Sequence, residues 1–211
     1  MQIVCLLFDG VTALDAVGPY EVLSRLPGAT FGFVAVEGTA VLTDNGVLGL
    51  EAGATMDQTA AADVLVVPGG LGTRRLVADE RVLAWIRSID ATTTWTTSVC
   101  TGSLLLGAAG LLRGVEATTH WSERHTLAAY GARPVVRRVV ESGKIVTAAG
   151  VSAGIDMALT LASRLAGEAV AQAIQLGIEY DPEPPFDAGT PEKAPPAVLG
   201  LVRELLGAPT G

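Results

Sequence analysis

One stretch of the sequence has the residue types and spacing of a nucleophile elbow, Ser98-Val99-Cys100-Thr101-Gly102-Ser103. The cysteine follows a strand-like segment and precedes a helical one, with small residues, Ser98 and Gly102, two positions to either side. A turn this sharp has no room for larger neighbours, and it places its side chain at a helix N-terminus, where the helix dipole favours a thiolate. The pattern therefore indicates a nucleophilic thiol at Cys100. A buried structural cysteine is the alternative that spacing alone leaves open.

The second cysteine, Cys5, lies in the middle of the apolar run 3–8 and has no turn or polar neighbour, which predicts a core residue. Two cysteines are too few for a disulfide scaffold or a zinc site, so we expect a reducing, cytoplasmic location. The N-terminus lacks the basic region of a signal peptide. The longest uncharged stretch, 91–112, is Thr-rich in its first half and is rejected as a membrane span.

Thiolate chemistry needs a group that moves protons, and the sequence offers few candidates. His125 is expected on a helix surface, and His120 could be a pocket wall or a satisfied structural histidine. Asp15 lies in an apolar setting, Leu14-Asp15-Ala16-Val17-Gly18-Pro19, which would raise its pKa toward neutrality, although a helix-capping aspartate remains an alternative. Asp9 and Asp44 are interpreted as ordinary turn acids.

Two glycines follow another apolar run, in Pro68-Gly69-Gly70. They free the backbone to aim an N–H into a cleft, and together with the N–H of Thr101 they would form a two-donor site of the oxyanion-hole type. A simple turn is the alternative, since Pro-Gly-Gly by itself is a common turn sequence.

These residues need a scaffold, and the rest of the chain alternates between apolar runs of strand length and helical patterns. Strands are expected over residues 3–8, 30–37, 64–67 and 92–99, with a hairpin over 39–51 and a strand pair formed by 135–140 and 144–147. Helices are expected from about Gly18-Pro19 to Pro27-Gly28 and over 74–89, 102–112, 121–130, 153–164 and 168–179. This alternation predicts an α/β fold with a mostly parallel central sheet and helices on both faces. Ligands bind such sheets at the carboxyl ends of strands, where Asp15, Gly69-Gly70 and Cys100 all lie.

The composition narrows the class of protein. The 211 residues include 22 acidic and 14 basic side chains, a net charge of −8 that argues against binding to nucleic acid or to anionic membranes. Hydrophobic residues make up 49% and charged residues 17%, which excludes a disordered chain and suggests an apolar surface hidden in an oligomer. We expect residues 1–211 to form a single domain, in which 181–211 is a Pro-rich arm with a final helix over 197–206.

Over nearly its whole length the sequence resembles the ThiJ/PfpI family of the class I glutamine amidotransferase-like superfamily. The elbow and the Thr-Thr-His-Trp segment are its most specific features. The resemblance rests on Leu14-Asp15 with Gly18-Pro19 and Glu21-Val22-Leu23, Pro68-Gly69-Gly70, Thr97 through Ser103, Ala117-Thr118-Thr119-His120-Trp121, Ala153-Gly154-Ile155-Asp156, and Pro184-Pro185-Phe186.

The resemblance implies a flavodoxin-like α/β sandwich and a homodimer. It makes Cys100 the nucleophile and Asp15 its acid/base partner, with Thr101 holding that pair and Gly70 supplying a second backbone donor. Within the family the sequence is most similar to the isonitrile hydratase branch. That similarity implies addition of water to a small isocyanide through a cysteine thioimidate, giving an N-substituted formamide with no metal or organic cofactor.

The sequence also departs from other parts of that family. Members that act as proteases, glyoxalases or chaperones often carry His directly after the cysteine, where this chain has Thr101. Glutamine amidotransferases carry a His-x-Glu segment that neither histidine here provides. Two alternatives remain open: a cysteine-based stress or redox sensor, and a ligand-sensing module like that of AraC-type regulators.

Overall fold

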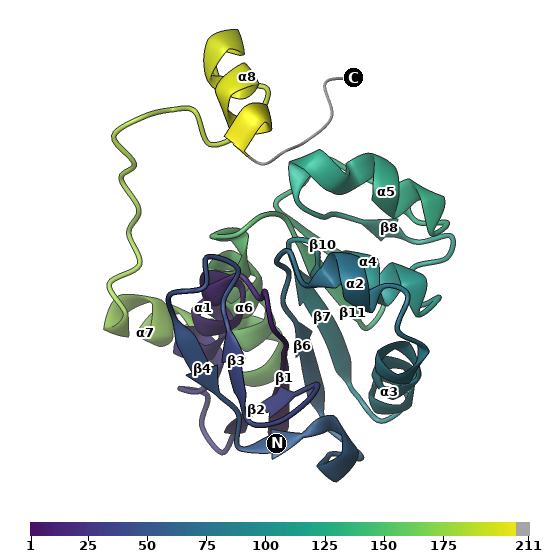
Figure 1. Cartoon of the computed structure of the whole chain (residues 1–211). Coiled ribbons are helices and arrows are strands. Elements are labelled where there is room, and N and C mark those ends of the chain that lie inside the picture. The colour runs from purple at the N-terminus through teal and green to yellow at the C-terminus, as the bar shows by residue number, and fades with distance from the viewer. Residues whose placement is uncertain (206–211) are drawn as a thin grey trace. The chain divides into compact units, whose positions relative to one another are not determined.

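The computed structural model describes residues 1–205, and the chain divides into two compact units, Met1–Ile178 and Glu179–Gly211. The main sheet of the first unit has seven strands: β1 (Gln2–Leu7), β2 (Thr30–Ala35), β5 (Ala54–Thr55), β6 (Val64–Val67), β7 (Trp95–Val99), β10 (Val139–Ser142) and β11 (Ile145–Ala148). Their order is β10-β11-β7-β6-β1-β2-β5, and all neighbours are parallel except the antiparallel pair β10–β11. The predicted mostly parallel sheet is therefore confirmed (Figure 1).

Two short sheets accompany the main one. The first is the antiparallel hairpin of β3 (Ala40–Leu42) and β4 (Gly49–Glu51), which the Asp44-Asn45-Gly46 sequence predicted. The second is a parallel pair formed by β8 (Glu116–Ala117) and β9 (Arg133–Pro134). Two 3₁₀ turns complete the connections, η1 (Met56–Gln58) and η2 (Trp121–Glu123).

Helices cover both faces of the main sheet, as predicted (Figure 1). One face carries α1 (Ala13–Leu23), α6 (Ala153–Ala166) and α7 (Glu168–Gly177), and α6 packs against both of the others. The other face carries α2 (Thr73–Leu76), α3 (Glu80–Asp90), α4 (Gly102–Ala108) and α5 (Arg124–Ala129), with α4 in contact with the other three. Because both faces are covered, β6 is buried along its whole length, and Cys5 is a fully buried core residue of β1, as predicted.

The first helix differs from the expectation. It begins at Ala13, not near Gly18, and Pro19 lies inside it. A proline has no N–H to donate to the carbonyl four residues earlier and normally ends a helix. Here close packing on α6 outweighs that signal: a Cβ on Gly18 would lie 3.2 Å from Ile155, and one on Gly154 would lie 3.3 Å from Pro19. This earlier start places Asp15 in the first turn of α1.

The helix expected over residues 74–89 is two helices, α2 and α3. The break lies at residues 77–79, where the Asp79 side chain accepts the backbone N–H groups of Arg81 at 3.0 Å and Val82 at 3.4 Å. Asp79 is therefore an N-cap that starts a new helix, a preference of aspartate that a continuous helical pattern conceals.

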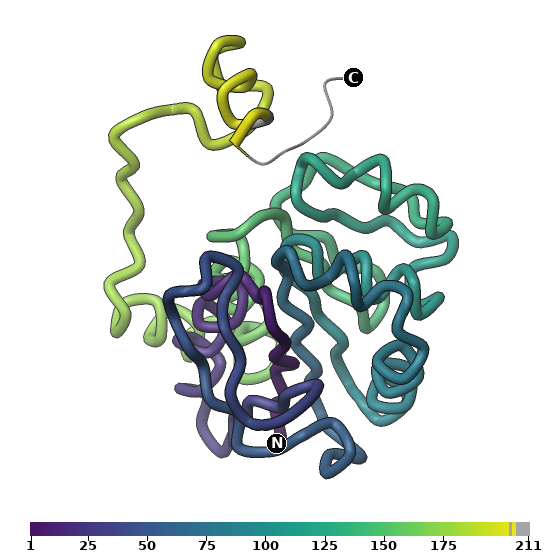
Figure 2. Tube along the Cα trace, in the orientation of Figure 1, coloured from purple at the N-terminus to yellow at the C-terminus, as the bar shows by residue number. Residues whose placement is uncertain are grey.

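The second unit contains one described helix, α8 (Pro196–Leu205), after residues 179–195, which form neither helix nor strand. Figure 2 traces those residues as an extended chain that leads into α8. Leu206, the expected last residue of this helix, lies outside the described residues, and the single domain over 1–211 stays a prediction. Among the helices of residues 1–205, none has the length and apolar character needed to cross a bilayer.

Candidate active site

Three neighbouring strands of the main sheet bring the candidate residues together. Asp15 follows β1, Gly69 and Gly70 follow β6, and Cys100 follows β7, so all lie at the carboxyl end of the sheet. The order in which strands are added to the sheet reverses at β1, because β2 lies on one side of β1 and β6 lies on the other. Such a reversal opens a crevice at the strand ends. The site thus lies where the fold class predicted it.

Cys100 has the strained backbone of an elbow. Its φ is +55°, a left-handed conformation that is uncommon for residues other than glycine. Its N–H donates to the carbonyls of Ala148 and Ala149 at 3.1 and 3.2 Å. Its carbonyl accepts the hydroxyls of Thr119 at 3.0 Å and Ser103 at 3.1 Å. These contacts from three parts of the chain hold the unfavourable conformation in place.

Steric contacts explain why the residue two positions after Cys100 is a glycine. A Cβ on Gly102 would lie 2.0 Å from the carbonyl oxygen of Val67, so α4 can begin this close to β6 only with glycine there. The predicted strand-to-helix turn and its small flanking residue are confirmed.

Asp15 is fully buried beside this turn. Its Oδ2 accepts the N–H of Gly69 at 2.9 Å, while its Oδ1 has no hydrogen-bond partner among the described residues. Burial raises the pKa of this carboxyl to about 7, although hydrogen bonds from Gly69 and Cys100 oppose the rise. Asp15 can therefore exchange a proton near neutral pH, as its apolar sequence setting predicted, and it does not cap the helix.

The Cys100 thiol differs from the acidic group that its place at a helix N-terminus predicted. Only 6% of the residue is exposed, and burial, together with the nearby negative charge of Asp15, raises its pKa well above the usual range. Hydrogen bonds from the backbone and side chain of Thr101 act in the opposite direction and favour the thiolate. Burial and the charge of its neighbour oppose ionisation of both groups, so Asp15 and Cys100 do not both lose their protons near neutral pH.

The Gly70 N–H has a different partner from the one expected. It donates to Oγ1 of Thr101 at 2.9 Å and so does not stand open to the pocket as an oxyanion donor. The Gly70 carbonyl accepts the hydroxyl of buried Thr73 at 2.8 Å, a shorter contact than its 3.3 Å to Thr101. The Thr101 hydroxyl also bonds the Cys100 sulfur, which favours the thiolate.

Comparison with known proteins fits this geometry. The model of the DJ-1/PfpI family matches residues 1–164. The chain belongs to the DJ-1/PfpI family. It is 48% identical to the isonitrile hydratase of Pseudomonas putida over 204 residues, which are 97% of this chain and 89% of that protein. A solved structure, a ThiJ/PfpI family protein from Pseudomonas syringae, aligns with a TM-score of 0.93 at 41% identity and covers 98% of this chain and 86% of that one.

A third relative has a different role. The chain is 29% identical over 150 residues to an HTH-type transcriptional regulator from Pseudomonas aeruginosa, a match that covers 69% of this chain and 44% of that protein. The comparisons together confirm the predicted family and its flavodoxin-like fold.

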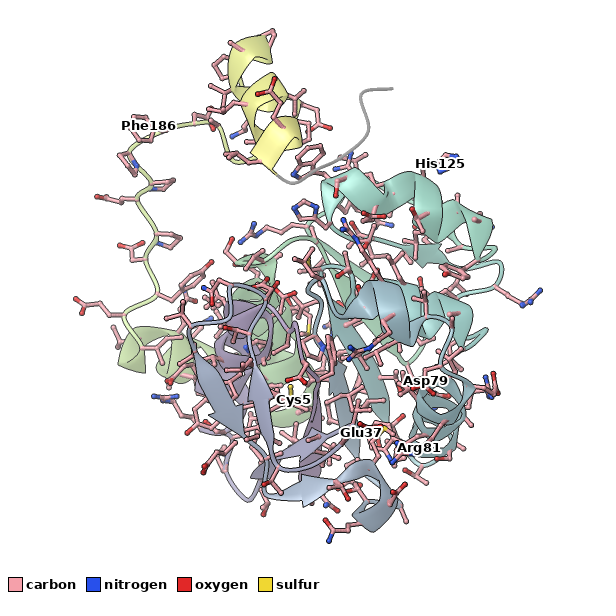
Figure 3. All side chains as sticks on the ribbon, in the orientation of Figure 1. Cys5, Glu37, Asp79, Arg81, His125 and Phe186 are labelled. Atoms are coloured by element: carbon pink, nitrogen blue, oxygen red, sulfur yellow. The ribbon has the colours of Figure 1, made fainter. Side chains whose placement is uncertain are left out.

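The two histidines of this DJ-1/PfpI chain lie in different settings. His125 is exposed on α5, as predicted (Figure 3). His120 is half-buried, its Nδ1 lies 2.8 Å from the Ser122 hydroxyl, and burial lowers its pKa. A Cβ on Gly150 would lie 2.3 Å from the His120 ring, so the imidazole packs on the loop that follows β11. A neutral imidazole in this position suits a wall of the site better than a proton shuttle.

Sequence reasoning about this DJ-1/PfpI site did not predict the contacts of three residues. Gly69 donates its N–H to Asp15, Thr73 donates its hydroxyl to the Gly70 carbonyl, and Thr119 donates its hydroxyl to the Cys100 carbonyl. Gly69 was expected to point its N–H into the cleft, and Thr119 was named only within the Thr-Thr-His-Trp segment. Thr73 carried no signal, because no local pattern marks it as buried. Within residues 1–205, no three His, Cys, Asp or Glu side chains gather closely enough to hold a metal ion.

Proposed function

We propose that this protein is an isonitrile hydratase, which adds water to an isocyanide and releases an N-substituted formamide. The observation that carries the proposal is the buried pair of Asp15 and Cys100, a thiol beside a carboxyl whose pKa burial raises to about 7. The 48% identity to the Pseudomonas putida isonitrile hydratase, over 97% of this chain, supports it. Hydration of an isocyanide needs both a nucleophile and a proton donor at the same carbon, and this pair supplies both.

The first step forms a thioimidate. The Cys100 thiol passes its proton to the Asp15 carboxylate, and Thr101 stabilises the thiolate that results. The sulfur then attacks the terminal isocyanide carbon while Asp15 gives the proton to that carbon. The carbon gains one bond to sulfur and one to hydrogen, and the carbon–nitrogen triple bond becomes a double bond. Gly70 takes part indirectly, because its N–H orients the Thr101 hydroxyl. We therefore assign Gly70 as a positioning residue and not as an oxyanion donor.

The second step adds water and regenerates the enzyme. Asp15, now a carboxylate held by Gly69, removes a proton from water as the oxygen attacks the thioimidate carbon, and passes that proton to the nitrogen. The tetrahedral adduct then expels the Cys100 sulfur as a thiolate, while Asp15 takes the proton of the new hydroxyl group, leaving the carbonyl of the formamide. Asp15 and Cys100 end with the single proton they began with, so the cycle consumes one isocyanide and one water. Neither step uses a metal or an organic cofactor.

Product analysis in oxygen-labelled water tests the reaction class. Cyclohexyl isocyanide should yield a formamide that carries one labelled oxygen, with no ammonia and no free amine, because this chemistry cleaves no carbon–nitrogen bond. Mass spectrometry of the product gives the label, and heat-inactivated protein controls for spontaneous hydration. Consumption of a peptide, glutamine or a dicarbonyl, with the isocyanide left intact, would contradict the hydratase and favour another activity or a sensing role.

We also propose a homodimer. Large apolar side chains are exposed on α1 and on the β3–β4 hairpin, namely Leu14, Tyr20, Leu42, Val47 and Leu48. Apolar surface of this kind is characteristic of an interface. Static light scattering at micromolar concentration should give twice the chain mass of 21.6 kDa. A mass of one chain that does not rise with concentration would contradict the dimer.

A cytoplasmic location is part of the same proposal. Both cysteines are free, and reducing compartments keep thiols in this state. A neutral small-molecule substrate needs neither nucleic acid nor membrane contacts. The chemistry therefore suits a compartment in which the Cys100 thiol is not oxidised.

A further inference from the structure

Hydrogen bonds join the β3–β4 hairpin to the loop between β1 and α1. The Leu42 N–H donates to Oδ1 of Asp9 at 2.9 Å, and the Asp44 N–H donates to the carbonyl of Val11, also at 2.9 Å. Asp9 lies in the turn after β1, as expected, and its carboxylate binds the backbone of the hairpin. The Asp44 side chain lies in the hairpin turn, as expected, and contacts a residue next to the candidate site.

That residue is Thr12, the N-cap of α1. A threonine at an N-cap usually accepts an N–H of the helix with its hydroxyl, but Thr12 makes no such bond. Its hydroxyl donates to Oδ2 of Asp44 at 2.5 Å instead. Helix α1 therefore lacks the usual N-cap hydrogen bond, and the Asp44 carboxylate fixes the orientation of the Thr12 side chain.

Thr12 belongs to a ring of backbone contacts that holds Asp15. The Thr12 N–H donates to the Gly69 carbonyl at 3.0 Å, and the Gly69 N–H donates to Oδ2 of Asp15 at 2.9 Å. The Asp15 N–H closes the ring by donating to the Thr12 carbonyl at 3.1 Å. A change in the position of Thr12 therefore reaches the Asp15 carboxyl through two hydrogen bonds.

The charge of Asp44 acts on the same carboxyl. The ionisable groups that interact with Asp15 are Cys5 of β1, Cys100 of the elbow and Asp44 of the hairpin turn. Burial is the main reason for the high pKa of Asp15, and the Asp44 charge adds to it in the same direction. Asp44 is exposed, so its charge is open to screening by salt.

We propose that Asp44 is a positioning residue for the hydration reaction: its carboxylate orients Asp15 through Thr12 and Gly69, and its negative charge acts on the Asp15–Cys100 pair. The inference rests on the proposed function for its effect on turnover. Its effect on the protonation of the pair can be measured without any isocyanide.

The test separates charge from orientation. Asp44→Asn keeps an acceptor for Thr12 and removes the charge, whereas Thr12→Val removes the hydroxyl and keeps the charge. Glu51→Gln is the matched control, since it removes one exposed charge from the opposite end of β4. The rate at which iodoacetamide alkylates Cys100, read by mass spectrometry from pH 5 to 10, reports the protonation of the pair.

For Asp44→Asn we expect the midpoints of the alkylation profile to move to lower pH by roughly 0.3–0.5, because a nearby negative charge that favours the protonated form is gone. The movement should shrink in 0.5 M NaCl. For Thr12→Val we expect little movement but a loss of about fivefold in kcat for isocyanide hydration, the scale of one hydrogen bond. Glu51→Gln should match the wild type in both measurements.

Each outcome decides something. An Asp44→Asn profile identical to that of the wild type overturns the role of the charge, and an unchanged kcat in Thr12→Val overturns the role in orientation. If the profile moves but the wild type hydrates no isocyanide, the coupling of Asp44 to the pair stands and the proposed function fails.

Discussion

Asp15→Asn is expected to lower kcat/KM for isocyanide hydration by roughly 10²- to 10⁴-fold, the contribution typical of a general acid–base group. Asparagine has nearly the shape of aspartate, and its side-chain oxygen can still accept the Gly69 N–H at the site of Oδ2. It cannot give a proton to the isocyanide carbon or take one from water. Steady-state assays with cyclohexyl isocyanide measure the loss.

The stability of the same variant provides a check on its fold and on the environment of Asp15. The pKa of this carboxyl rises from 3.8 in the unfolded chain to about 7 in the folded protein. The folded state therefore binds more protons than the unfolded state between pH 4 and 7, and the free energy of unfolding falls as pH rises through that window, by on the order of 4 kcal/mol. This component of the pH dependence should be absent from Asp15→Asn, as thermal melts from pH 4 to 8 would show.

His120→Ala is the control for this prediction. The imidazole packs on Gly150 and bonds Ser122, so its removal should cost turnover far less than the loss of Asp15. If His120→Ala abolishes turnover and Asp15→Asn retains it, the carboxylate mechanism is wrong and a histidine takes its place.

The second large effect is expected for Cys100→Ala, which should reduce turnover to the uncatalysed rate. Without the sulfur no thioimidate forms, and Asp15 alone cannot hold the isocyanide carbon in a covalent intermediate. The fold should persist, because alanine can occupy the buried site and keeps the backbone contacts to Ala148, Ala149 and Thr119.

Acid-quenched samples offer a direct readout of this step. Intact-protein mass spectrometry should detect an adduct with the mass of one isocyanide on the wild type and on Cys5→Ala, but not on Cys100→Ala. Cys5→Ala is the matched variant because Cys5 is also a buried thiol with a raised pKa, lying within the core of β1. An adduct that requires Cys5 in place of Cys100 would refute the assignment of the nucleophile.

Patterns that are complete within a few residues were predictable from the sequence. The strand Val64–Val67 was predicted at its true bounds, because a run of four apolar, mostly β-branched residues that ends at Pro68 is typical of a buried strand. The hairpin turn and the elbow were also visible, because Gly46 has a φ of +70° and a Cβ on Gly102 would clash with the carbonyl of Val67. The family resemblance then made Asp15 a candidate that its local sequence left ambiguous.

What the sequence could not reveal depends on contacts between distant segments. In the sequence Pro19 predicts a helix start. In the structure the helix continues through Pro19, which packs against Gly154 of α6. The helix dipole argues for an acidic thiol at Cys100, but burial beside Asp15 acts more strongly and in the opposite direction. The partner of the Gly70 N–H depends on where the Thr101 hydroxyl lies, which no local pattern specifies.

The anchoring of Cys100 also has a consequence for how the chain folds. Its carbonyl bonds Thr119, and its N–H bonds Ala148 and Ala149, almost fifty residues further along the chain. Contacts of such long sequence separation form late, after the loops between them have closed. Until then Cys100 is an ordinary accessible thiol. The nascent chain is therefore most vulnerable to oxidants and alkylating agents before β11 docks beside β7, and docking of that strand is the event that both completes the reactive site and shelters it.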